Sequence, residues 1–439
     1  MAIHPLLLEK LNQAIAPLLP PASTPRDARL PAVKGKAHAV TGMRCAGKTT
    51  FLRQLQASVR ETLPPERALY ISFDDDRIAD LELDQLSLLL EEYYRRQPET
   101  RGRQVVHWFF DEIQLVDGWE RFVRRVLDTE RVEIVVSGSS ARMLSREVHT
   151  SLRGRGMETV IRPFSFREFL RHRGEEPDEE ARRWTAAERS LVEKRFLEFL
   201  AGGGFPEAQG IDRPLRVQLL QGYVDAVLFR DIVERHQVSQ VAALRWLTRH
   251  CLRNPAGSFS VNRFYNDLKA QGHAVSKDAV HDLLGYLVDA FLISTVSVAT
   301  ESERRRNTNP RKIYPVDPGL IGAFDAGGRS NVGYALECTV MNEIERRGGE
   351  VAYVKTAGGW EVDFLVHRAD GKRELIQVCA DPSSDETADR ELRALAAAAR
   401  EHPRVARRLL VLTRDQTLGI EAKGVAIEPV YEWILATGA

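Results

Sequence analysis

The sequence has few of the features that mark secreted, metal-clustered or membrane-embedded proteins. Its 439 residues include only four cysteines, and no two of them form a CxxC pair. This scarcity argues against a disulfide framework or a cysteine zinc site, and it suits a reducing compartment. No apolar run approaches the roughly 18 residues of a membrane span, and Pro5–Leu8 is too short for a secretory signal. We therefore expect a soluble cytoplasmic protein with no membrane partner.

An excess of charge of either sign is also missing. Lys and Arg together number 62, and so do Asp and Glu, which gives a formal net charge of zero. The chain as a whole is therefore no polycation, and any contact with nucleic acid must come from a local basic patch. A chain of this length can form two or three domains, each with its own core.

What the sequence does contain is a phosphate-binding loop near its start. The stretch Ala37–Leu55 combines a short apolar run, a turn that fits GxxxxGK[ST] and a helix-like segment. Backbone amides of such a loop and the positive end of the following helix hold a polyphosphate. Lys48 is expected to reach the β and γ phosphates, and Thr49 to place its hydroxyl on Mg²⁺. The residues expected to bind ATP are Gly42, Met43, Arg44, Cys45, Ala46, Gly47, Lys48, Thr49 and Thr50.

A hydrophobic run that ends in two acids, Val105–Gln114, predicts the second part of the same site. Its continuous apolarity is typical of a central parallel strand that is covered on both faces. Asp111 is expected to hold Mg²⁺ through water, and Glu112 to orient and polarise the attacking water. Because the two acids occur together with a phosphate loop, they favour ATP hydrolysis over nucleotide binding alone.

A further β-branched strand, Glu130–Ser140, ends in small hydroxyl residues at the same predicted edge of the sheet. Ser139 is the candidate sensor of the γ-phosphate, and Ser137 is the alternative. Arg153 or Arg155 is the candidate for stabilising transition-state charge, either within the chain or across a subunit interface of a homo-oligomer. A plain serine turn and a solvated basic loop are the competing interpretations of these two segments.

Together these motifs resemble a prokaryotic ATPase family. The resemblance is carried by TGMRCAGKTT, FFDEIQ, VVSGSSARML with the following RGRG, RPFSFREFL and the later GGGFPEA. In that family an AAA-type nucleotide-binding domain is fused to a C-terminal domain of unknown function with a restriction-nuclease-like fold. The resemblance therefore implies an α/β fold with a P-loop NTPase parallel sheet, followed by a winged-helix module and a nuclease-like α/β domain.

The pattern of residues 240–298 is itself typical of a winged helix, which is a helix-turn-helix followed by a β-hairpin. The predicted helices are Val241–Leu252, Val261–Gln271 and Lys277–Ala290, and the predicted strands are Leu292–Val298 and Lys312–Val316. The loop between the strands, the wing, has a local excess of positive charge that can grip DNA phosphates. The candidate nucleic-acid contacts are Arg304, Arg305, Arg306, Arg311 and Lys312. A solvated basic hairpin on a connecting domain is the alternative interpretation.

The last domain resembles a nuclease core that has lost part of its metal-ligand set. In that core a helix glutamate, an Asp in the phrase GxEVDF and an ExK pair bind metal and activate water. Glu337, Glu361 and Asp363 stand where the acids are expected, but Gln377 and Cys379 replace the ExK pair. An amide and a thiol supply neither the anionic ligand nor the cation that such a site needs. We therefore predict no nuclease activity, and a role as a scaffold or as a platform for nucleic acid or a partner.

These predictions combine into one domain plan and two candidate functions. The predicted domains are an N-terminal helix and linker in residues 1–35, a P-loop ATPase in 36–200, a helical and winged-helix domain in 201–325, and a nuclease-like domain in 326–439. The predicted function is a Mg²⁺-dependent ATPase that couples hydrolysis to rearrangement of the C-terminal modules on DNA, as a recombination or repair motor or switch. The alternative is a signalling or defence ATPase whose C-terminal domains bind a protein partner, with no role on DNA. A nucleotide sensor without enzymatic activity ranks third.

Overall fold

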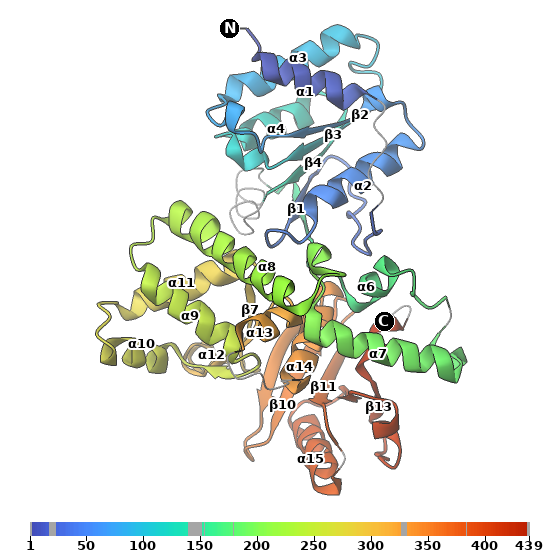
Figure 1. Cartoon of the computed structure of the whole chain (residues 1–439), viewed down its shortest axis with the longest axis vertical. Helices are drawn as coiled ribbons and strands as arrows, with labels where there is room; N and C mark the ends of the chain where they lie inside the picture. Colours follow the sequence, from blue (N-terminus) through green and yellow to red (C-terminus); the bar gives the residue numbers. More distant parts are fainter. Residues whose placement is uncertain are drawn as a thin grey trace. The chain divides into compact units, whose positions relative to one another are not determined.

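The chain forms two compact units, which are coloured along the sequence in Figure 1. The computed structural model describes residues 2–16, 23–138, 152, 154–178, 180–325, 332–382 and 384–436. One unit comprises Met1–Arg162 with Asp289–Phe291, and the other comprises Pro163–Val288 with Leu292–Ala439. Within the described ranges, no helix combines the length and the apolar character that crossing a membrane requires.

The first unit is built on a five-stranded sheet. Its strands are β1 (Ala37–Thr41), β2 (Ala68–Ser72), β3 (Val106–Asp111), β4 (Val132–Ser137) and β5 (Gly156–Val160). They lie in the order β2-β3-β4-β1-β5, and every neighbouring pair is parallel. Parallel neighbours need long crossover connections, which the helices between the strands provide. The α/β fold and the parallel sheet predicted from the sequence are confirmed.

Helices cover both faces of this sheet (Figure 1). They are α1 (Pro5–Ile15), α2 (Lys48–Arg60), α3 (Leu83–Arg96) and α4 (Trp119–Thr129). Trp108 and Phe110 of β3 pack in the core formed with α1, α3 and α4, whereas Phe109 packs in the core formed with α2. Successive side chains of a strand point to opposite faces, so a strand covered on both sides is apolar throughout. This arrangement explains the continuous hydrophobic run that marked β3 in the sequence.

The segment 23–36, predicted to be a linker, packs into the first unit. The Arg26 guanidinium donates a hydrogen bond of 2.9 Å to the Ala46 carbonyl, and a second one to the Arg162 carbonyl. The amide of Gln54 donates to the Thr24 carbonyl at 2.7 Å. These contacts could not be predicted from the sequence, because the segment has no helical or strand periodicity and its partners are distant in the chain. The described part of residues 1–35 therefore belongs to the same unit as the sheet.

The second unit is larger and mostly helical. Its helices are α6 (Phe166–His172), α7 (Ala186–Gly202), α8 (Arg213–Ala226), α9 (Val241–Arg253), α10 (Val261–Ala270), α11 (Lys277–Asp289), α12 (Glu303–Thr308), α13 (Pro318–Phe324), α14 (Val332–Arg346), α15 (Asp385–Glu401) and α16 (Val430–Leu435). A π-helical segment, Val227–Glu234, continues α8. Helices α9, α10 and α11 lie where the sequence predicted helices, to within one residue at each end.

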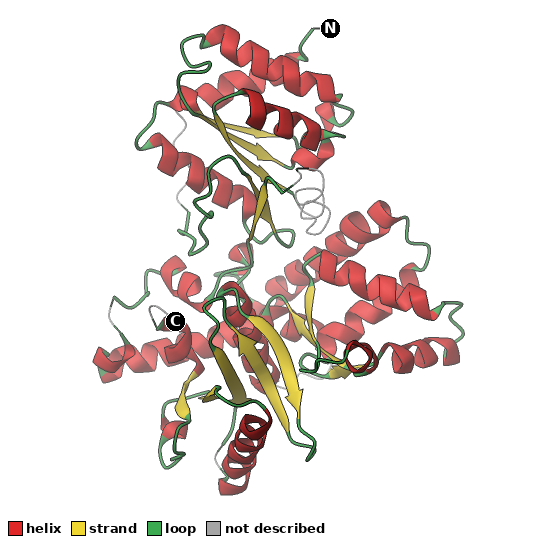
Figure 2. Ribbon diagram, turned by 180° about the vertical axis from the view of Figure 1, so that it is seen from behind, coloured by secondary structure: helices red, strands yellow, loops and turns green. Residues whose placement is uncertain are grey.

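Two sheets accompany these helices (Figure 2). The smaller is antiparallel and has the order β6-β8-β7, with β6 (Ser258–Phe259), β7 (Ile293–Val296) and β8 (Arg311–Pro315). The larger is mixed and has the order β13-β12-β11-β10-β9, with β9 (Glu350–Lys355), β10 (Glu361–His367), β11 (Arg373–Cys379), β12 (Ala406–Val411) and β13 (Ala426–Pro429). The sequence missed β6, and it predicted a loop where α12 lies.

The boundary between the units falls before α6, earlier than the predicted domain end at residue 200. Phe166 of α6 packs edge-on against Phe196 of α7, with ring centroids 5.0 Å apart. Phe196 in turn meets Tyr431 of α16 at 5.7 Å. All three rings are buried in the core of the second unit. The prediction was wrong here because the partner of these aromatic residues lies more than two hundred residues further along the chain.

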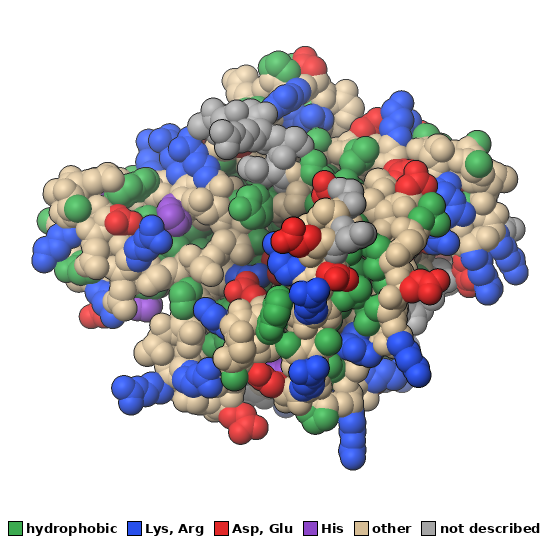
Figure 3. Space-filling model, turned by 90° about the horizontal axis from the view of Figure 1, so that it is seen from below, with side chains coloured by type: hydrophobic (Ala, Val, Ile, Leu, Met, Phe, Trp, Pro, Cys, Tyr) green, Lys and Arg blue, Asp and Glu red, His purple; other side chains and the backbone are tan. Residues whose placement is uncertain are grey.

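The charged side chains show no separation by sign on the face seen in Figure 3. Basic and acidic groups are interspersed there, as the neutral net charge leads one to expect. Any basic contact surface on this face is therefore local.

Candidate functional site

The phosphate-binding loop connects the carboxyl end of β1 to the start of α2. Gly42 has a φ of 137°, and a Cβ atom there would lie 2.0 Å from the Ile161 carbonyl oxygen, so no other residue fits. Gly47 also has a positive φ, and it precedes α2 without a side-chain cap. The first amides of an uncapped helix have no partner within the helix. The loop therefore presents backbone donors to an anion at the end of α2.

Lys48 lies inside the curve of this loop. Its ammonium donates hydrogen bonds to the carbonyl oxygens of Gly42 at 2.9 Å and Met43 at 3.0 Å. The side chain is only 6 % exposed. A buried ammonium must be paired or hydrogen-bonded, and these carbonyls hold it beside the backbone donors of the loop.

Asp111 at the end of β3 is the centre of a buried hydrogen-bond network. It is 2 % exposed. Its Oδ2 accepts hydrogen bonds from the Thr49 hydroxyl at 2.8 Å and the Tyr70 hydroxyl at 2.5 Å. Its Oδ1 accepts one from the Ser137 hydroxyl. The structure thus brings Thr49 and Asp111 together, the two residues that the sequence predicts at a magnesium ion.

Glu112 follows with an unusual backbone conformation. Its φ of 55° lies in the left-handed region, which residues other than glycine rarely adopt. Its amide donates to the Ser137 hydroxyl at 3.2 Å, and its carboxylate accepts a hydrogen bond from the Gln114 amide. Strain of this kind persists where the surrounding structure holds the residue in place, and it concentrates at functional sites. Ser137 therefore positions both acids of the pair.

Sequence reasoning missed Tyr70 and Arg53. The Arg53 guanidinium lies over the Tyr70 ring, 3.3 Å from its centroid. Burial, followed by the charge of Asp111, raises the pKa of Tyr70 well above its usual value, so the phenol stays protonated and donates. The contact depends on β2 lying beside β3, and only the strand order reveals that.

Two of the remaining predicted residues, Ser139 and Arg153, lie outside the described residues. Arg155 is described, and it corrects one prediction. Its carbonyl accepts a hydrogen bond from the amide of Ala37, the first residue of β1, and its guanidinium pairs with Asp128. β5 runs parallel to β1, and Arg155 lies beside the first residue of β1. Because the phosphate loop follows the last residue of β1, Arg155 lies at the opposite end of the strands. It therefore does not act on a phosphate of its own chain, and a role across a subunit interface stays a prediction.

A second cluster of charged residues lies in the second unit. Glu337 of α14 and Glu361 and Asp363 of β10 surround the ammonium of Lys312, which comes from β8. The distances from Nζ to the nearest carboxylate oxygens are 3.4, 3.0 and 2.9 Å, respectively. The Tyr314 hydroxyl donates to Glu337 at 2.7 Å. The acids predicted from the nuclease resemblance are thus brought together.

Lys312 itself corrects a prediction. It was expected on the wing surface as a contact for DNA phosphates, but it is 4 % exposed and points to the acids. Burial by itself lowers the pKa of its ammonium, but Asp363, Glu337 and Glu361 more than offset this, so the net shift is upward. Of the other wing candidates, Arg304 and Arg305 are exposed, whereas Arg306 pairs with Glu303. Arg311 is half-buried.

Gln377 and Cys379 occupy the places where the resemblance implies an ExK pair. Gln377 accepts a hydrogen bond from the Asp363 amide at 3.2 Å and donates to Glu391 at 2.8 Å. Cys379 is buried, and burial raises the pKa of its thiol to about 11. Neither side chain therefore carries a charge at this site near neutral pH.

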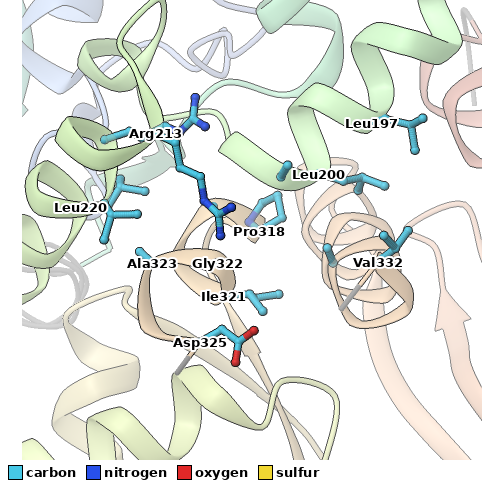
Figure 4. A pocket seen from close by; sticks show the side chains of 15 residues that line it. Leu197, Leu200, Arg213, Leu220, Pro318, Ile321, Gly322, Ala323, Asp325 and Val332 are labelled. Carbon is cyan, nitrogen blue, oxygen red and sulfur yellow. The ribbon is translucent and has the colours of Figure 1, made fainter. Parts of the chain in front are cut away.

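A cavity of about 400 Å³ lies among α7, α8, α13 and α14 of the second unit (Figure 4). Leu200, Leu220 and Ile321 form apolar walls (Figure 4), and Arg213 and Arg216 are the basic residues of the lining. None of the residues of the phosphate loop lines this cavity. Four helices contribute its walls, so no single stretch of sequence indicates it.

Comparisons with known proteins match the two parts of the chain to two different domain families. An AAA domain model matches residues 34–170, and a model of a domain of unknown function, DUF8612, matches residues 193–330. The uncharacterized protein MJ1544 of Methanocaldococcus jannaschii is 32 % identical over 84 % of this chain and 80 % of its own length. An uncharacterized protein of Haemophilus influenzae is 28 % identical over 75 % of this chain and 79 % of its own. The AAA-type domain predicted from the sequence is therefore confirmed.

Among solved structures, a Walker-type ATPase of Pyrococcus abyssi, PABY2304, aligns with 74 % of this chain and 96 % of its own. The identity is 13 % and the TM-score is 0.36. A similarity at this level supports no argument about function.

Proposed function

We propose that this chain, which belongs to the same family as the uncharacterized protein MJ1544, is a Mg²⁺-dependent ATP hydrolase with its catalytic centre in the first unit. The observation that supports this most is the hydrogen bond of 2.8 Å between Thr49 and Asp111 at the mouth of the phosphate loop. It joins the hydroxyl and the carboxylate that this class of enzyme uses to hold the metal.

The residues present fit a magnesium ion. Thr49 and Asp111 offer oxygen donors, which Mg²⁺ prefers, and Asp111 is held by three hydroxyl groups. Thr49 and Asp111 would hold the ion, and a bound Mg²⁺ would neutralise negative charge that develops on the phosphates during transfer.

Residues of the phosphate loop and its neighbours have the two remaining roles, binding of the phosphates and activation of water. Backbone amides of the loop and the Lys48 ammonium bind the phosphates, because amides of such a turn bind anions and the Gly42 and Met43 carbonyls hold the ammonium at the same turn. Glu112 orients a water molecule and takes up its proton as the water oxygen attacks the γ-phosphorus. The bond from the γ-phosphorus to the bridging oxygen breaks, which leaves ADP and inorganic phosphate. The hydrogen bond from the Gln114 amide holds the Glu112 carboxylate for this step.

Two substitutions test the assignment by separating binding from turnover. Lys48→Ala is expected to abolish binding of a fluorescent ATP analogue, whereas Glu112→Gln is expected to keep binding and to lose phosphate release. The matched controls are Lys34→Ala and Glu99→Gln, whose side chains are exposed. A Glu112→Gln protein that released phosphate at the rate of the unchanged chain would remove Glu112 from this role.

For the second unit we propose a winged-helix module that contacts the DNA backbone and moves as ATP turns over. The helices α9, α10 and α11 and the three-stranded antiparallel sheet of β6, β7 and β8 support this fold, and α12 lies between β7 and β8. Arg304 and Arg305 are exposed on α12, at the place of the predicted wing. Because Lys312 is buried and Arg306 is paired with Glu303, the basic surface is smaller than the sequence suggested.

The DNA role is tested by phosphate release measured with and without single-stranded, double-stranded and branched DNA. Stimulation that disappears in Arg304→Ala/Arg305→Ala would support it, and Arg393→Ala, an exposed arginine of α15, is the control. A rate that is indifferent to every DNA would favour the alternative, an ATPase with a signalling or defence role that binds a protein partner. The same proposal includes a homo-oligomer in which Arg155 acts across the subunit interface. It also includes a cytoplasmic location.

A further inference from the structure

The second unit contains a buried ammonium at a place where the fold resemblance implies a metal ion. Lys312 reaches from β8 toward three carboxylates that belong to α14 and β10. Its side chain is almost completely buried. A buried charge is stable only when it is paired and hydrogen-bonded, so the three carboxylates are what allow the Lys312 ammonium to be buried.

The residues present do not fit a divalent metal in addition to this ammonium. A divalent cation binds carboxylate oxygens at about 2.0–2.6 Å, and Nζ already lies 2.9 Å from Asp363 and 3.0 Å from Glu361. A metal on the same oxygens would lie against the ammonium, and the two positive charges would repel each other. With Lys312 between these acids, no group of three or more His, Cys, Asp or Glu among the described residues is arranged to hold a metal.

The hydrogen bonds around the acids are consistent with a monovalent cation. Asp363 uses Oδ1 for Lys312, and its Oδ2 accepts a hydrogen bond from the Val378 amide at 3.0 Å. Gln377 is neutral, and both ends of its amide are engaged, with the Asp363 amide and with Glu391. An acid at position 377 would add one negative charge. Its absence matches a site whose cation carries one positive charge instead of two.

From these contacts we propose that Lys312 is the resident cation of the acidic site of Glu337, Glu361 and Asp363, where it takes the place of a divalent metal. The ammonium belongs to a side chain of β8, and Asp363 and Glu361 belong to β10. The contact therefore also connects the small antiparallel sheet of β6, β7 and β8 to the mixed sheet of β9 to β13 in the same unit. A site of this kind has a structural role, because it holds β8 against α14 and β10 within the second unit. It binds no metal while Lys312 is present, and it does not hydrolyse phosphodiester bonds.

The proposal predicts that a metal site opens when the ammonium is removed. Lys312→Met keeps most of the apolar stem and leaves the three acids without a cation. In the full-length chain without nucleotide, the variant is expected to gain one bound Mn²⁺, measured as loss of the free-ion signal in electron paramagnetic resonance. Adding Asp363→Asn to this variant is expected to abolish the gain. Lys372→Met is the control, because this lysine is 80 % exposed.

Thermal unfolding gives an independent measurement on the same proteins. With a chelator present, Lys312→Met is expected to lower the unfolding temperature of the second unit by roughly 10 °C, because the remaining buried acids repel each other. Mn²⁺ is expected to restore part of this loss. Lys312→Met/Asp363→Asn is expected to unfold at a higher temperature than Lys312→Met alone, because it carries one fewer uncompensated charge.

The unchanged chain provides a test that does not depend on how well a variant folds. If nucleotide-free protein binds one Mn²⁺ that Asp363→Asn abolishes, metal and ammonium coexist and the proposal is wrong. Cleavage of plasmid DNA that requires both Mg²⁺ and Asp363 would overturn it as well. A Lys312→Met variant that folds but gains no Mn²⁺ affinity would show that the acids were never arranged for a cation. Each of these outcomes is distinct from a failure of the ATP hydrolase proposal.

Discussion

The Thr49 hydroxyl donates a hydrogen bond of 2.8 Å to the carboxylate of Asp111, although 62 residues separate the two in the chain. Thr49 lies in the first turn of α2, and Asp111 ends β3. Strand order brings them together, because β4 alone lies between β3 and the β1 strand that leads into the loop. Around this pair, the proposed catalytic centre depends on residues from the three strands β2, β3 and β4, from α2 and from the loop that follows β1.

Tyr70→Phe is expected to raise the Mg²⁺ concentration needed for half-maximal phosphate release by about tenfold. The substitution removes the 2.5 Å hydrogen bond to Asp111 and leaves the ring under Arg53. Groups that orient a metal ligand are typically worth about 10–100-fold in metal affinity or activity. Titration of Mg²⁺ at saturating ATP measures the effect, with Tyr334→Phe, an exposed tyrosine, as the control. An unchanged Mg²⁺ requirement would show that Thr49 and Ser137 suffice to hold Asp111.

Gly204→Ala is expected to lower the free energy of unfolding of the second unit by about 1–3 kcal/mol. A Cβ at this position would lie 2.1 Å from the Phe164 carbonyl oxygen, and backbone cannot move aside as a flexible side chain can. The amide of Phe164 also donates to the Gly204 carbonyl at 2.7 Å. Chemical denaturation measures the loss. Gly222→Ala in α8, where a Cβ meets nothing within 4 Å, is the control and should stabilise by about 0.5–1 kcal/mol.

Phe196→Ala is expected to destabilise the second unit by about 3–5 kcal/mol and to leave ATP binding unchanged. The ring is fully buried and contacts Phe166 and Tyr431, which belong to the same unit. Denaturation curves combined with nucleotide titration of the folded protein separate the two effects. Leu197→Ala, at a position that is 43 % exposed, should change neither quantity appreciably. Loss of nucleotide affinity in Phe196→Ala would instead place α7 with the first unit, as the sequence had predicted.

Asp317 is expected to make the second unit less stable as the pH rises from about 4 to 6. Burial raises the pKa of this carboxyl from 3.8 to about 6, even though the amides of Gly204 and Gly319 donate to it. Since the folded-state pKa exceeds the unfolded one, the folded chain keeps a proton that the unfolded chain has already released. The stabilisation is complete below pH 4 and is lost by the time the pH passes 6.

The neutral variant Asp317→Asn isolates this contribution. Relative to the unchanged chain, its free energy of unfolding is expected to rise by up to about 3 kcal/mol between pH 4 and pH 7. Urea denaturation at several pH values measures the difference. Asp278→Asn, an exposed aspartate of α11, should show no such trend. A constant difference between the two proteins across this range would mean that Asp317 keeps its charge when buried.

Local sequence patterns determined much of the first unit. Gly42, Gly47, Lys48 and Thr49 specify a loop whose conformation depends on neighbouring residues, so spacing alone predicted it. The apolar run before Asp111 predicted a doubly covered strand for the same reason. Periodicity also located α9, α10 and α11 in the second unit to within one residue. In each of these cases the pattern that allows the prediction is local in the chain.

Tertiary structure decided everything that depends on which segments meet. Tyr70 beside Asp111, Arg155 at the far end of the strands, and the aromatic contacts that assign α6 and α7 to the second unit all join distant parts of the chain. Lys312 is the clearest case, because its flanking arginines made it resemble a surface contact for DNA. Only the packing of β8 against β10 turned its ammonium inward to three acids. A side chain's local sequence fixes its charge, but the fold fixes whether that charge meets water or a buried partner.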